Sequence, residues 1–385
     1  MAEAKYPCLF TTELLADRLA DIPRPAGFDF LRISLAYAIV AWHTIIICYG
    51  AQYENHLWFG PLRSFLYYLV PTFFALSGFL VAGSMDRNDP LTFAWFRFIR
   101  IFPALSFEVF LSAILLGLVF STLSFRDYVS DPGFWRYFSN ILGAITYHLP
   151  GVFGDHPDQT VNRQLWTVPI ELEVYVGLVL FWMLRLFEIP RTLLYALVIA
   201  GLAYALYSAI FGHFLPFYNK PGNGLVMCTF FAGVLFYRLR DRIVLSFPNF
   251  LLAVFSSYGL LWFEGTKYLA VIPLVYATVW LGTRDFTLGL IGRLADYSYG
   301  VYLFGYPLQQ TAFDISTLAR HPLGNFLIAA PAATVLAAFS WHVIEHPLLR
   351  RRKQLYAAVG QAIGFVEGLT VPRRKVERPE AAPAG

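Results

Sequence analysis

Residues 28–49 read FDFLRISLAYAIVAWHTIIICY, an apolar run in which Asp29, Arg32 and His43 are the ionisable groups that stand out. The run matches the roughly 20 helical residues that are needed to cross a hydrocarbon core about 30 Å thick. It is too long for the core of a signal peptide, and no small-residue cleavage pattern follows it directly. We therefore expect a membrane-spanning helix that stays in the mature protein.

The rest of the chain repeats this pattern. Of 385 residues, 57% are hydrophobic and 14% are charged, whereas about a quarter are charged in soluble domains. The apolar runs do not alternate, which favours helices over a barrel. We predict an all-α polytopic integral membrane helix bundle occupying residues 28–349, after an N-terminal segment 1–27. The ten expected spans are 28–49, 62–84, 99–120, 165–187, 192–211, 223–238, 244–262, 267–283, 297–315 and 323–345.

The distribution of charge predicts how the bundle is oriented. Most of the 29 Lys and Arg residues fall on the side that holds both termini, so both termini should be cytoplasmic in a bacterial inner membrane. Because basic residues lie between apolar runs and in the tail, the net charge of +4 does not predict a nucleic-acid partner. The tail, 350–385, should be disordered or lie on anionic membrane lipid.

Two further features carry weaker signals. The long segment 121–164 should form an extracytoplasmic loop, which either covers a site or is simply an ordered surface loop. Three cysteines, Cys8, Cys48 and Cys228, form neither a disulfide framework nor a metal-ligand spacing, and we expect no metal site.

Ionisable groups inside spans are costly, so each one is a candidate functional residue. Arg32 and His43 lie eleven residues apart, which places them on one helix face about 16 Å apart along the axis. Glu171, in the fourth span, should lie at a depth similar to that of His43. The two could form a general-base pair, in which the carboxylate orients the imidazole. A structural contact that only ties two helices together explains the pattern equally well.

A second group of polar residues falls at the opposite, basic ends of the spans. Arg97 and Arg100 share one helix face, and their guanidinium groups could clamp phosphates bidentately. Ordinary arginines that snorkel to the membrane surface would look the same. Ser77 could belong to this level or, with Gly78, allow close helix packing. Glu345 would most simply form a structural ion pair with a nearby arginine.

Six segments together resemble the acyltransferase 3 family, whose members modify bacterial surface and secreted carbohydrates. The segments cover residues 28–350 in the family's order. The matching positions are Asp29, Arg32 and His43; Ser77, Gly78 and Phe79; Arg97 and Arg100; Trp166, Glu171 and Tyr175; Ser298, Tyr299, Gly300, Tyr302 and Leu303; and Ile344, Glu345 and Pro347. One departure is Gly305, which occupies a position where many members have a histidine.

The resemblance implies an O-acyltransferase. His43 would be catalytic, with Glu171, and acyl-CoA, commonly acetyl-CoA, would be the donor substrate rather than a permanently bound cofactor. Arg32, Arg97, Arg100 and Ser77 would hold the donor. Supporting roles fall to Asp29, Trp166, Tyr175, Tyr299, Tyr302 and Glu345. The acceptor would be a surface or exported glycan, such as exopolysaccharide or O-antigen, or a lipid-linked saccharide, and polysaccharide-assembly machinery could be a partner.

Two other classes of function remain as alternatives. A transporter or flippase would also use several helices with a few buried charges, although the chain halves show no repeat and no paired interrupted helices. A carbohydrate sensor or structural membrane protein would not need a buried histidine in line with an arginine. A transporter should retain counterflow without an acyl donor, and a sensor should tolerate the loss of His43.

Overall fold

The computed structural model describes residues 12–22, 25–58, 60–184, 195–196, 199, 201–204, 206–207, 210, 221–285 and 294–370, with residues 295 and 360–370 described by their backbone alone. The α-helices are α1 (Leu15–Asp21), α2 (Ala26–Leu57), α3 (Arg63–Met85), α4 (Pro90–Phe110), α5 (Gly117–Phe120), α6 (Phe125–Ser130), α7 (Pro132–Tyr137), α8 (Thr167–Met183), α10 (Asn223–Arg238), α11 (Phe247–Leu260), α12 (Val271–Gly282), α14 (Ser298–Ile315), α15 (Pro322–Ser340) and α16 (His346–Thr370). Two π-helical turns, η1 (Leu111–Leu116) and η8 (Trp341–Glu345), continue α4 and α15. Short 3-10 turns are η2 (Phe138–Leu142), η3 (Arg163–Trp166), η5 (Glu264–Thr266), η6 (Ala295–Tyr297) and η7 (Thr317–Arg320).

The predicted all-α class and multi-pass membrane character are confirmed. In the described part of the chain, five continuous helical stretches are long and apolar enough to cross a bilayer: Ala26–Leu57, Arg63–Met85, Pro90–Phe120, Arg163–Met183 and Pro322–Val359. The expected spans 223–238, 244–262, 267–283 and 297–315 correspond to α10, α11, α12 and α14. Half of the expected span 192–211 lies outside the described residues.

Local sequence signals explain where several helices begin. Asp89 caps α4, because its carboxylate accepts a hydrogen bond from the Thr92 amide at 3.0 Å and Pro90 occupies the first helical position. Ser246 caps α11 in the same way through the Asn249 amide. Within α2, Gly50 adopts a φ of 79°, a left-handed conformation that favours glycine, so the helix changes direction after His43.

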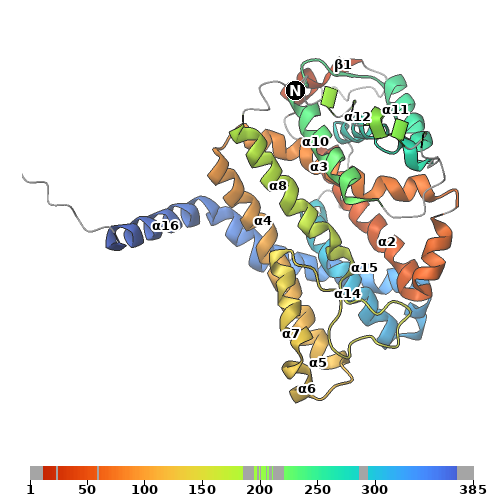
Figure 1. Ribbon diagram of the computed structural model, residues 1–385, viewed down its shortest axis with the longest axis vertical. Coiled ribbons are helices and arrows are strands. Elements are labelled where there is room, and N and C mark those ends of the chain that lie inside the picture. The colour runs from red at the N-terminus through yellow and green to blue at the C-terminus, as the bar shows by residue number, and fades with distance from the viewer. Residues whose placement is uncertain are drawn as a thin grey trace, which may run out of the picture.

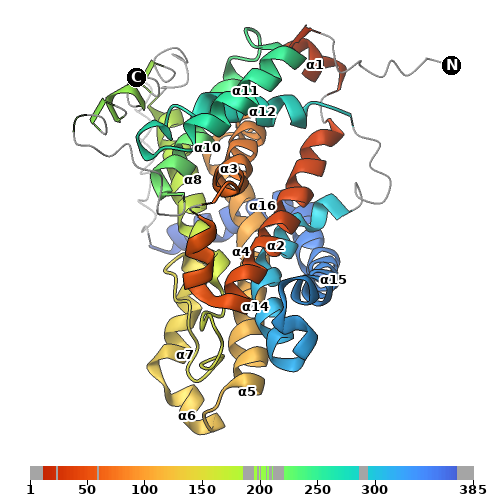
Figure 2. The same ribbon diagram turned by 90° about the vertical axis from the view of Figure 1, so that its right-hand side faces the viewer.

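The helices form one body with two distinct ends. Figure 2 shows α1, α11 and α12 gathered at one end and α5, α6 and α7 at the other. At the first end, strand β1 (Glu13–Leu14) pairs antiparallel with β2 (Val244–Leu245). Arg18 adds an ion pair to Asp285 at 2.6 Å. This part of the predicted N-terminal segment is therefore folded against the bundle.

The predicted loop between the third and fourth spans is also folded. We call residues 121–162 the 121–162 lobe; it contains α6, α7 and η2 and lies at the lower end of the molecule in Figure 1. A bridge between Ser121 and Val152 closes it near its base. The Asn140 side chain is fully buried, donates to the Thr146 carbonyl and accepts from the Thr146 amide. The lobe is thus held by internal hydrogen bonds.

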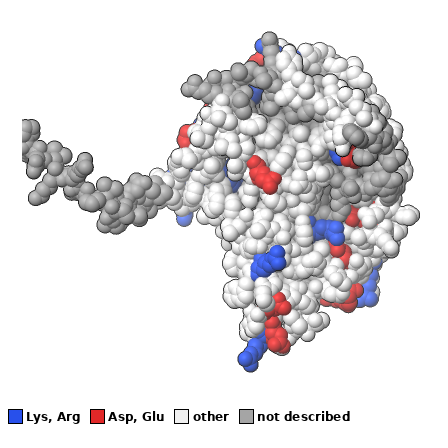
Figure 3. All heavy atoms as spheres, in the orientation of Figure 1, with Lys and Arg blue, Asp and Glu red and all other residues white. Residues whose placement is uncertain are grey.

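The predicted tail is helical in its first part. α16 continues the chain from α15 and η8 as far as Thr370 and projects away from α4 in Figure 1. Disorder was one of two expectations for 350–385, and residues 350–370 are helical instead. The remaining residues, 371–385, lie outside the described part of the chain. Figure 3 shows that the face seen in Figure 1 carries few charged side chains, several of them near the end where α6 lies, as a lipid-facing surface requires.

Helices α3 and α10 approach so closely that their glycines have no room for a side chain. A Cβ atom on Gly78 would lie 2.0 Å from the backbone oxygen of Phe230, and one on Gly233 would lie 2.2 Å from that of Ala75. Because backbone atoms on both sides form the contact, the neighbours cannot give way by a side-chain rotation. This finding confirms close helix packing as one role of the Ser77-Gly78 pair.

Replacing Gly78 with alanine should therefore destabilise the folded protein. Overpacking a well-packed core costs about 1–3 kcal/mol, and a helix shift would be needed here. We expect a lower melting temperature in detergent, measured by fluorescence-detected unfolding. Gly259→Ala is the matched control, because a Cβ atom at Gly259 would meet nothing within 4 Å. Equal melting temperatures for both variants would contradict the close-packing argument.

Candidate functional site

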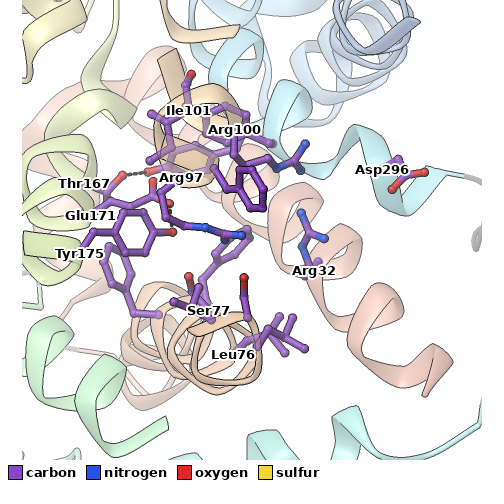
Figure 4. A pocket seen from close by; sticks show the side chains of 18 of the residues that line it. Arg32, Leu76, Ser77, Arg97, Arg100, Ile101, Thr167, Glu171, Tyr175 and Asp296 are labelled. Carbon is purple, nitrogen blue, oxygen red and sulfur yellow. Dashed lines mark hydrogen bonds between the residues drawn. The ribbon is translucent and has the colours of Figure 1, made fainter. Parts of the chain in front are cut away.

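An arginine-rich cavity of about 470 Å³ lies between α2, α3, α4, α8, α14 and the start of α16. Five arginines and three carboxylates line it: Arg32, Arg87, Arg97, Arg100 and Arg352, with Asp29, Glu171 and Asp296. Figure 4 shows Arg32 on one side of this space and Arg97 and Arg100 on the other, with Ser77 below them on α3. The excess of positive charge suits a ligand with several negative charges, such as phosphate groups.

Arg100 is held by a buried ion pair. Its Nη1 lies 3.2 Å from Oε2 of Glu345, whose side chain is 2% exposed. The other carboxylate oxygen accepts a hydrogen bond from Ser340 at 3.1 Å. Trp341 contacts the guanidinium, with its ring centroid 5.3 Å from Cζ. The prediction that Glu345 forms an ion pair with a clustered arginine is confirmed, and the pair connects α4 to η8.

Arg97 is arranged differently from Arg100. Its Nε atom is buried and has no hydrogen-bond partner among the described residues, and its Cζ lies 5.7 Å from the ring centroid of Phe93. Glu171 lines the same cavity and accepts a hydrogen bond from the Tyr175 hydroxyl at 2.8 Å. A buried donor without a partner is costly unless a ligand satisfies it. Arg97 is therefore a side chain in this cavity whose buried donor a bound ligand would satisfy.

The end of the cavity beside α16 contains two arginines that the sequence analysis did not assign to the site. Arg352, from α16, lies with its Cζ 4.4 Å from the ring centroid of Phe96. Its backbone oxygen accepts a hydrogen bond from Trp95 Nε1 at 2.9 Å, which attaches α16 to α4. Arg87 lines the cavity from the end of α3. The sequence analysis used both only in the distribution of basic residues, Arg352 within the tail 350–385.

The opposite end of the cavity points toward His43. Ile39 and Tyr302 line this end, and the Tyr302 hydroxyl donates to the Gln164 carbonyl at 2.8 Å. His43 follows Ile39 by four residues on α2, and Tyr306 follows Tyr302 by four residues on α14. Each therefore lies about one helical turn, or about 6 Å, further along its helix. Their ring centroids are 5.0 Å apart. The cavity thus ends one turn short of the histidine.

The two residues predicted to be catalytic lie at different levels. Glu171 lines the cavity beside the arginines, whereas His43 lies beyond the set of residues that line it. Glu171 is one turn further along α8 than Thr167, and Thr167 is level with Tyr302 because their hydroxyls are 2.8 Å apart. The geometry therefore gives Glu171 a place in the cavity, and its pairing with His43 stays a prediction.

A different carboxylate, from the 121–162 lobe, contacts Tyr306, whose ring lies against His43. Asp158 is 7% exposed and accepts a hydrogen bond from the Tyr306 hydroxyl. Arg163 binds both of its oxygens, at 2.8 Å and 3.0 Å, and Thr160 donates to it at 2.6 Å. Sequence reasoning left open whether this loop covers a site and did not identify Asp158. An acidic residue five positions before an arginine at the start of a span was the available signal.

Comparison with known proteins identifies the family. A family model described as an acyltransferase domain, Acyl_transf_3, matches residues 26–344. The chain belongs to this acyltransferase family. It is similar to an O-acetyl transferase of Shigella phage Sf6, with 26% identity over 341 residues that cover 84% of this chain and 96% of the relative. It is also similar to nodulation protein 10 of Rhizobium leguminosarum bv. viciae, with 26% identity over 358 residues, 86% of this chain and 95% of the relative. No solved structure matches it significantly.

The other predicted site residues of this acyltransferase lie in or beside the cavity. Asp29, Ser77, Tyr175, Tyr299 and Tyr302 line it together with the arginines. The Tyr299 hydroxyl donates to the Ile101 carbonyl at 3.3 Å, which ties α14 to α4. Trp166 packs, partly buried, against the adjacent hydrophobic core. These positions fit supporting roles, and what each contributes to activity stays a prediction.

Gly305 allows α14 of the acyltransferase to touch α2. A Cβ atom at this position would lie 2.7 Å from Cγ2 of Val40, whose side chain is 1% exposed. Gln309, one turn later, donates a hydrogen bond to the Val40 carbonyl at 2.8 Å. The chain therefore has no space here for the histidine that the family resemblance would place at this position.

The ion pair of Asp158 predicts how the lobe responds to acid. Burial pushes the pKa of Asp158 upward, but the hydrogen bonds and charge of Arg163 outweigh burial, so the pKa lies below its ordinary value of 3.8. A carboxyl group with a lowered pKa in the folded state stabilises the fold above its ordinary pKa, and the contribution is lost as pH falls through the folded value.

We therefore expect the acyltransferase to lose part of its stability below pH 3.8, the ordinary pKa of Asp158. The Asp158→Asn variant cannot titrate at this position, so its melting temperature should be lower at neutral pH and fall less steeply in acid. Melting temperatures in detergent over a pH series measure both effects. Parallel curves for the two proteins over the whole series would contradict a stabilising, ionised Asp158.

Proposed function

We propose that this membrane acyltransferase moves an acyl group, acetyl in the simplest case, from acyl-CoA to a hydroxyl group of a surface or exported glycan. The observation that carries the proposal is the continuity of the site: an arginine-lined cavity ends one helical turn from a histidine in the first long helix. Such a layout suits a long donor molecule that carries phosphate groups at one end and the reactive acyl group at the other.

The donor would enter with its phosphates among the arginines. Arg97 offers a buried Nε that has no partner in the part of the chain that the structure describes, while Arg100 is oriented by Glu345. Guanidinium groups bind phosphate oxygens through two parallel hydrogen bonds, which fix both position and charge. Arg32 and Ser77 complete the predicted donor-binding set on α2 and α3. The pantetheine arm would then extend past Ile39 and Tyr302 toward His43.

The chemistry at His43 would be general-base catalysis. The neutral imidazole takes the proton of the acceptor hydroxyl as its oxygen attacks the thioester carbonyl. The C–S bond then breaks, the acyl group forms an ester, and the CoA thiolate receives the proton from the imidazolium. A transient acyl-histidine that hands the group to the acceptor is the alternative route.

The comparisons support the acyl-transfer part of the proposal. One relative is named as an O-acetyl transferase, and it aligns over 96% of its length. Acetyl is therefore the first acyl group to test. The glycan acceptor, such as exopolysaccharide, O-antigen or a lipid-linked saccharide, rests on the resemblance of the sequence motifs, as does an association with polysaccharide-assembly machinery.

The proposed topology follows the positive charge. We infer ten spans in a bacterial inner membrane, with both termini cytoplasmic, because most basic residues lie on that side. The arginine cavity would then face the cytoplasm, where acyl-CoA is present. His43 would lie in the outer half of the membrane beneath the 121–162 lobe. Cysteine-accessibility labelling at Gly154 and Arg87 would test the two sides.

Transfer of label from donor to glycan tests the proposal. Everted membranes that contain the protein, and matched membranes without it, are incubated with isotope-labelled acetyl-CoA and host glycans. We expect label in a base-labile ester on carbohydrate only with the protein. Binding of CoA without labelled glycan would contradict the proposed acyl group or acceptor. Glycan movement without any dependence on acyl-CoA would contradict acyl transfer and favour a transporter.

A further inference from the structure

We propose that Tyr306 is a positioning residue for His43 and that Asp158 of the 121–162 lobe holds it in place. The inference rests on the proposed function, because it assumes that His43 performs the transfer. The rings of His43 and Tyr306 meet nearly perpendicular, with an interplanar angle of 75° and centroids 5.0 Å apart. Edge-to-face contacts of this kind have a preferred orientation, so each ring restricts the other.

The Tyr306 ring is fixed at its helix. The residue is fully buried on α14, and the preceding Gly305 brings this helix against Val40 of α2. A bond from Gln309 to the Val40 carbonyl holds the same two helices together one turn later, at 2.8 Å. The spacing between the backbones that carry Tyr306 and His43 is therefore set at Val40, within one turn of His43.

The Tyr306 ring is also fixed at its hydroxyl end. The hydroxyl donates to Asp158 Oδ2, and Arg163 holds both oxygens of that carboxylate. The Gln310 side chain donates to the backbone oxygens of Asp158 and Thr160, at 2.6 Å and 2.7 Å. A ring held at both ends cannot tilt away from the histidine without breaking buried hydrogen bonds.

Asp158 does not act on His43 through its charge. Its two oxygens are occupied by Arg163, Thr160 and Tyr306, so the cluster is close to neutral and its effect on His43 is geometric. A catalytic group must be held close to its productive position, since a displacement of about 1 Å can reduce the rate about 100-fold. The contact between Asp158 and Tyr306 thus completes a site whose histidine is on α2.

The test compares two mild variants with wild type. Tyr306→Phe keeps the ring and removes the hydroxyl, and Asp158→Asn keeps the shape but replaces one accepting oxygen with an amide nitrogen that cannot accept a hydrogen bond. We expect each to lower kcat for acyl transfer by about tenfold to 100-fold, with the donor KM within about twofold of wild type because the arginine cavity is untouched. The double variant should lose little more than either single one, because both remove the same constraint.

His156→Ala is the matched control for loss of lobe docking. His156 is buried, and its Nδ1 lies 2.8 Å from Oε1 of Gln310, so it also ties the lobe to α14. We expect its kcat to stay within about twofold of wild type, since it acts on the lobe and not on the Tyr306 ring. An equal loss in His156→Ala would overturn the inference by showing that any break in the lobe suffices. Gel filtration in detergent checks that each variant folds. If Asp158→Asn does not fold, the kcat of Tyr306→Phe alone decides whether the inference holds.

The result also separates this inference from the proposed function. Wild-type kcat in Tyr306→Phe, together with an inactive His43→Ala, would overturn the positioning role and leave the acyltransferase mechanism intact. Full activity in His43→Ala would instead remove the catalytic assignment on which both proposals stand.

Discussion

Replacing His43 with alanine should lower kcat for acyl transfer by about 100-fold to 10,000-fold, the range expected for losing a general acid-base group. The donor KM should change little, because His43 lies beyond the residues that line the arginine cavity. A loss confined to kcat indicates an interaction made in the transition state and not in donor binding. Initial rates with labelled acetyl-CoA, at equal amounts of folded protein in membranes, measure both constants.

His56→Ala provides the matched control, since His56 is an exposed histidine near the end of the same helix α2. It should retain wild-type rates. Equal losses of kcat in the two variants would show that α2 tolerates no histidine replacement. They would contradict a chemical role for His43. A normal rate in His43→Ala would show that another group activates the acceptor hydroxyl.

The sequence was informative about the fold because the solvent of this protein is a bilayer. A helix is the segment that satisfies its own backbone in lipid, so each long apolar run had one local solution. The run 223–238 coincides with α10, and 62–84 differs from α3 by one residue at each end. The packing of these helices was harder to predict, because Gly78 and Gly233 come together from positions far apart in the chain.

The two levels of the candidate site were predicted unequally. The arginine level was predictable, since Arg97 and Arg100 lie one turn apart on one helix and Glu345 pairs with Arg100 as expected. The level of His43 was not, because its neighbour Tyr306 is held by Asp158 from a lobe without a periodic pattern. Depth along a helix suggested Glu171 as its partner. The pairing of Glu171 with His43 stays a prediction, and the fold of the lobe brings a second carboxylate, Asp158, into contact with Tyr306.

Replacing Arg97 with alanine should raise the donor KM by about tenfold to 100-fold. Hydrogen bonds to charged groups contribute about 1.5–3 kcal/mol, and each 1.4 kcal/mol is a factor of ten in affinity. Arg97 suits this test better than Arg100, because removing Arg100 would leave the buried Glu345 without its cation and destabilise the fold. Saturation curves with acetyl-CoA and the glycan acceptor in excess give the KM.

Two further variants decide whether geometry or charge at Arg97 binds the donor. Arg97→Lys keeps the charge but lacks the planar fork that binds two phosphate oxygens at once, so it should recover only part of the lost affinity. Arg126→Ala, which removes an exposed arginine from the 121–162 lobe, should leave the KM unchanged. If Arg126→Ala weakens donor binding as much as Arg97→Ala, net charge and not the cavity governs it. If the Arg97→Ala variant binds acyl-CoA normally, the donor lies elsewhere in the bundle. The Nε atom of wild-type Arg97, which has no partner among the described residues, would then bind some other ligand.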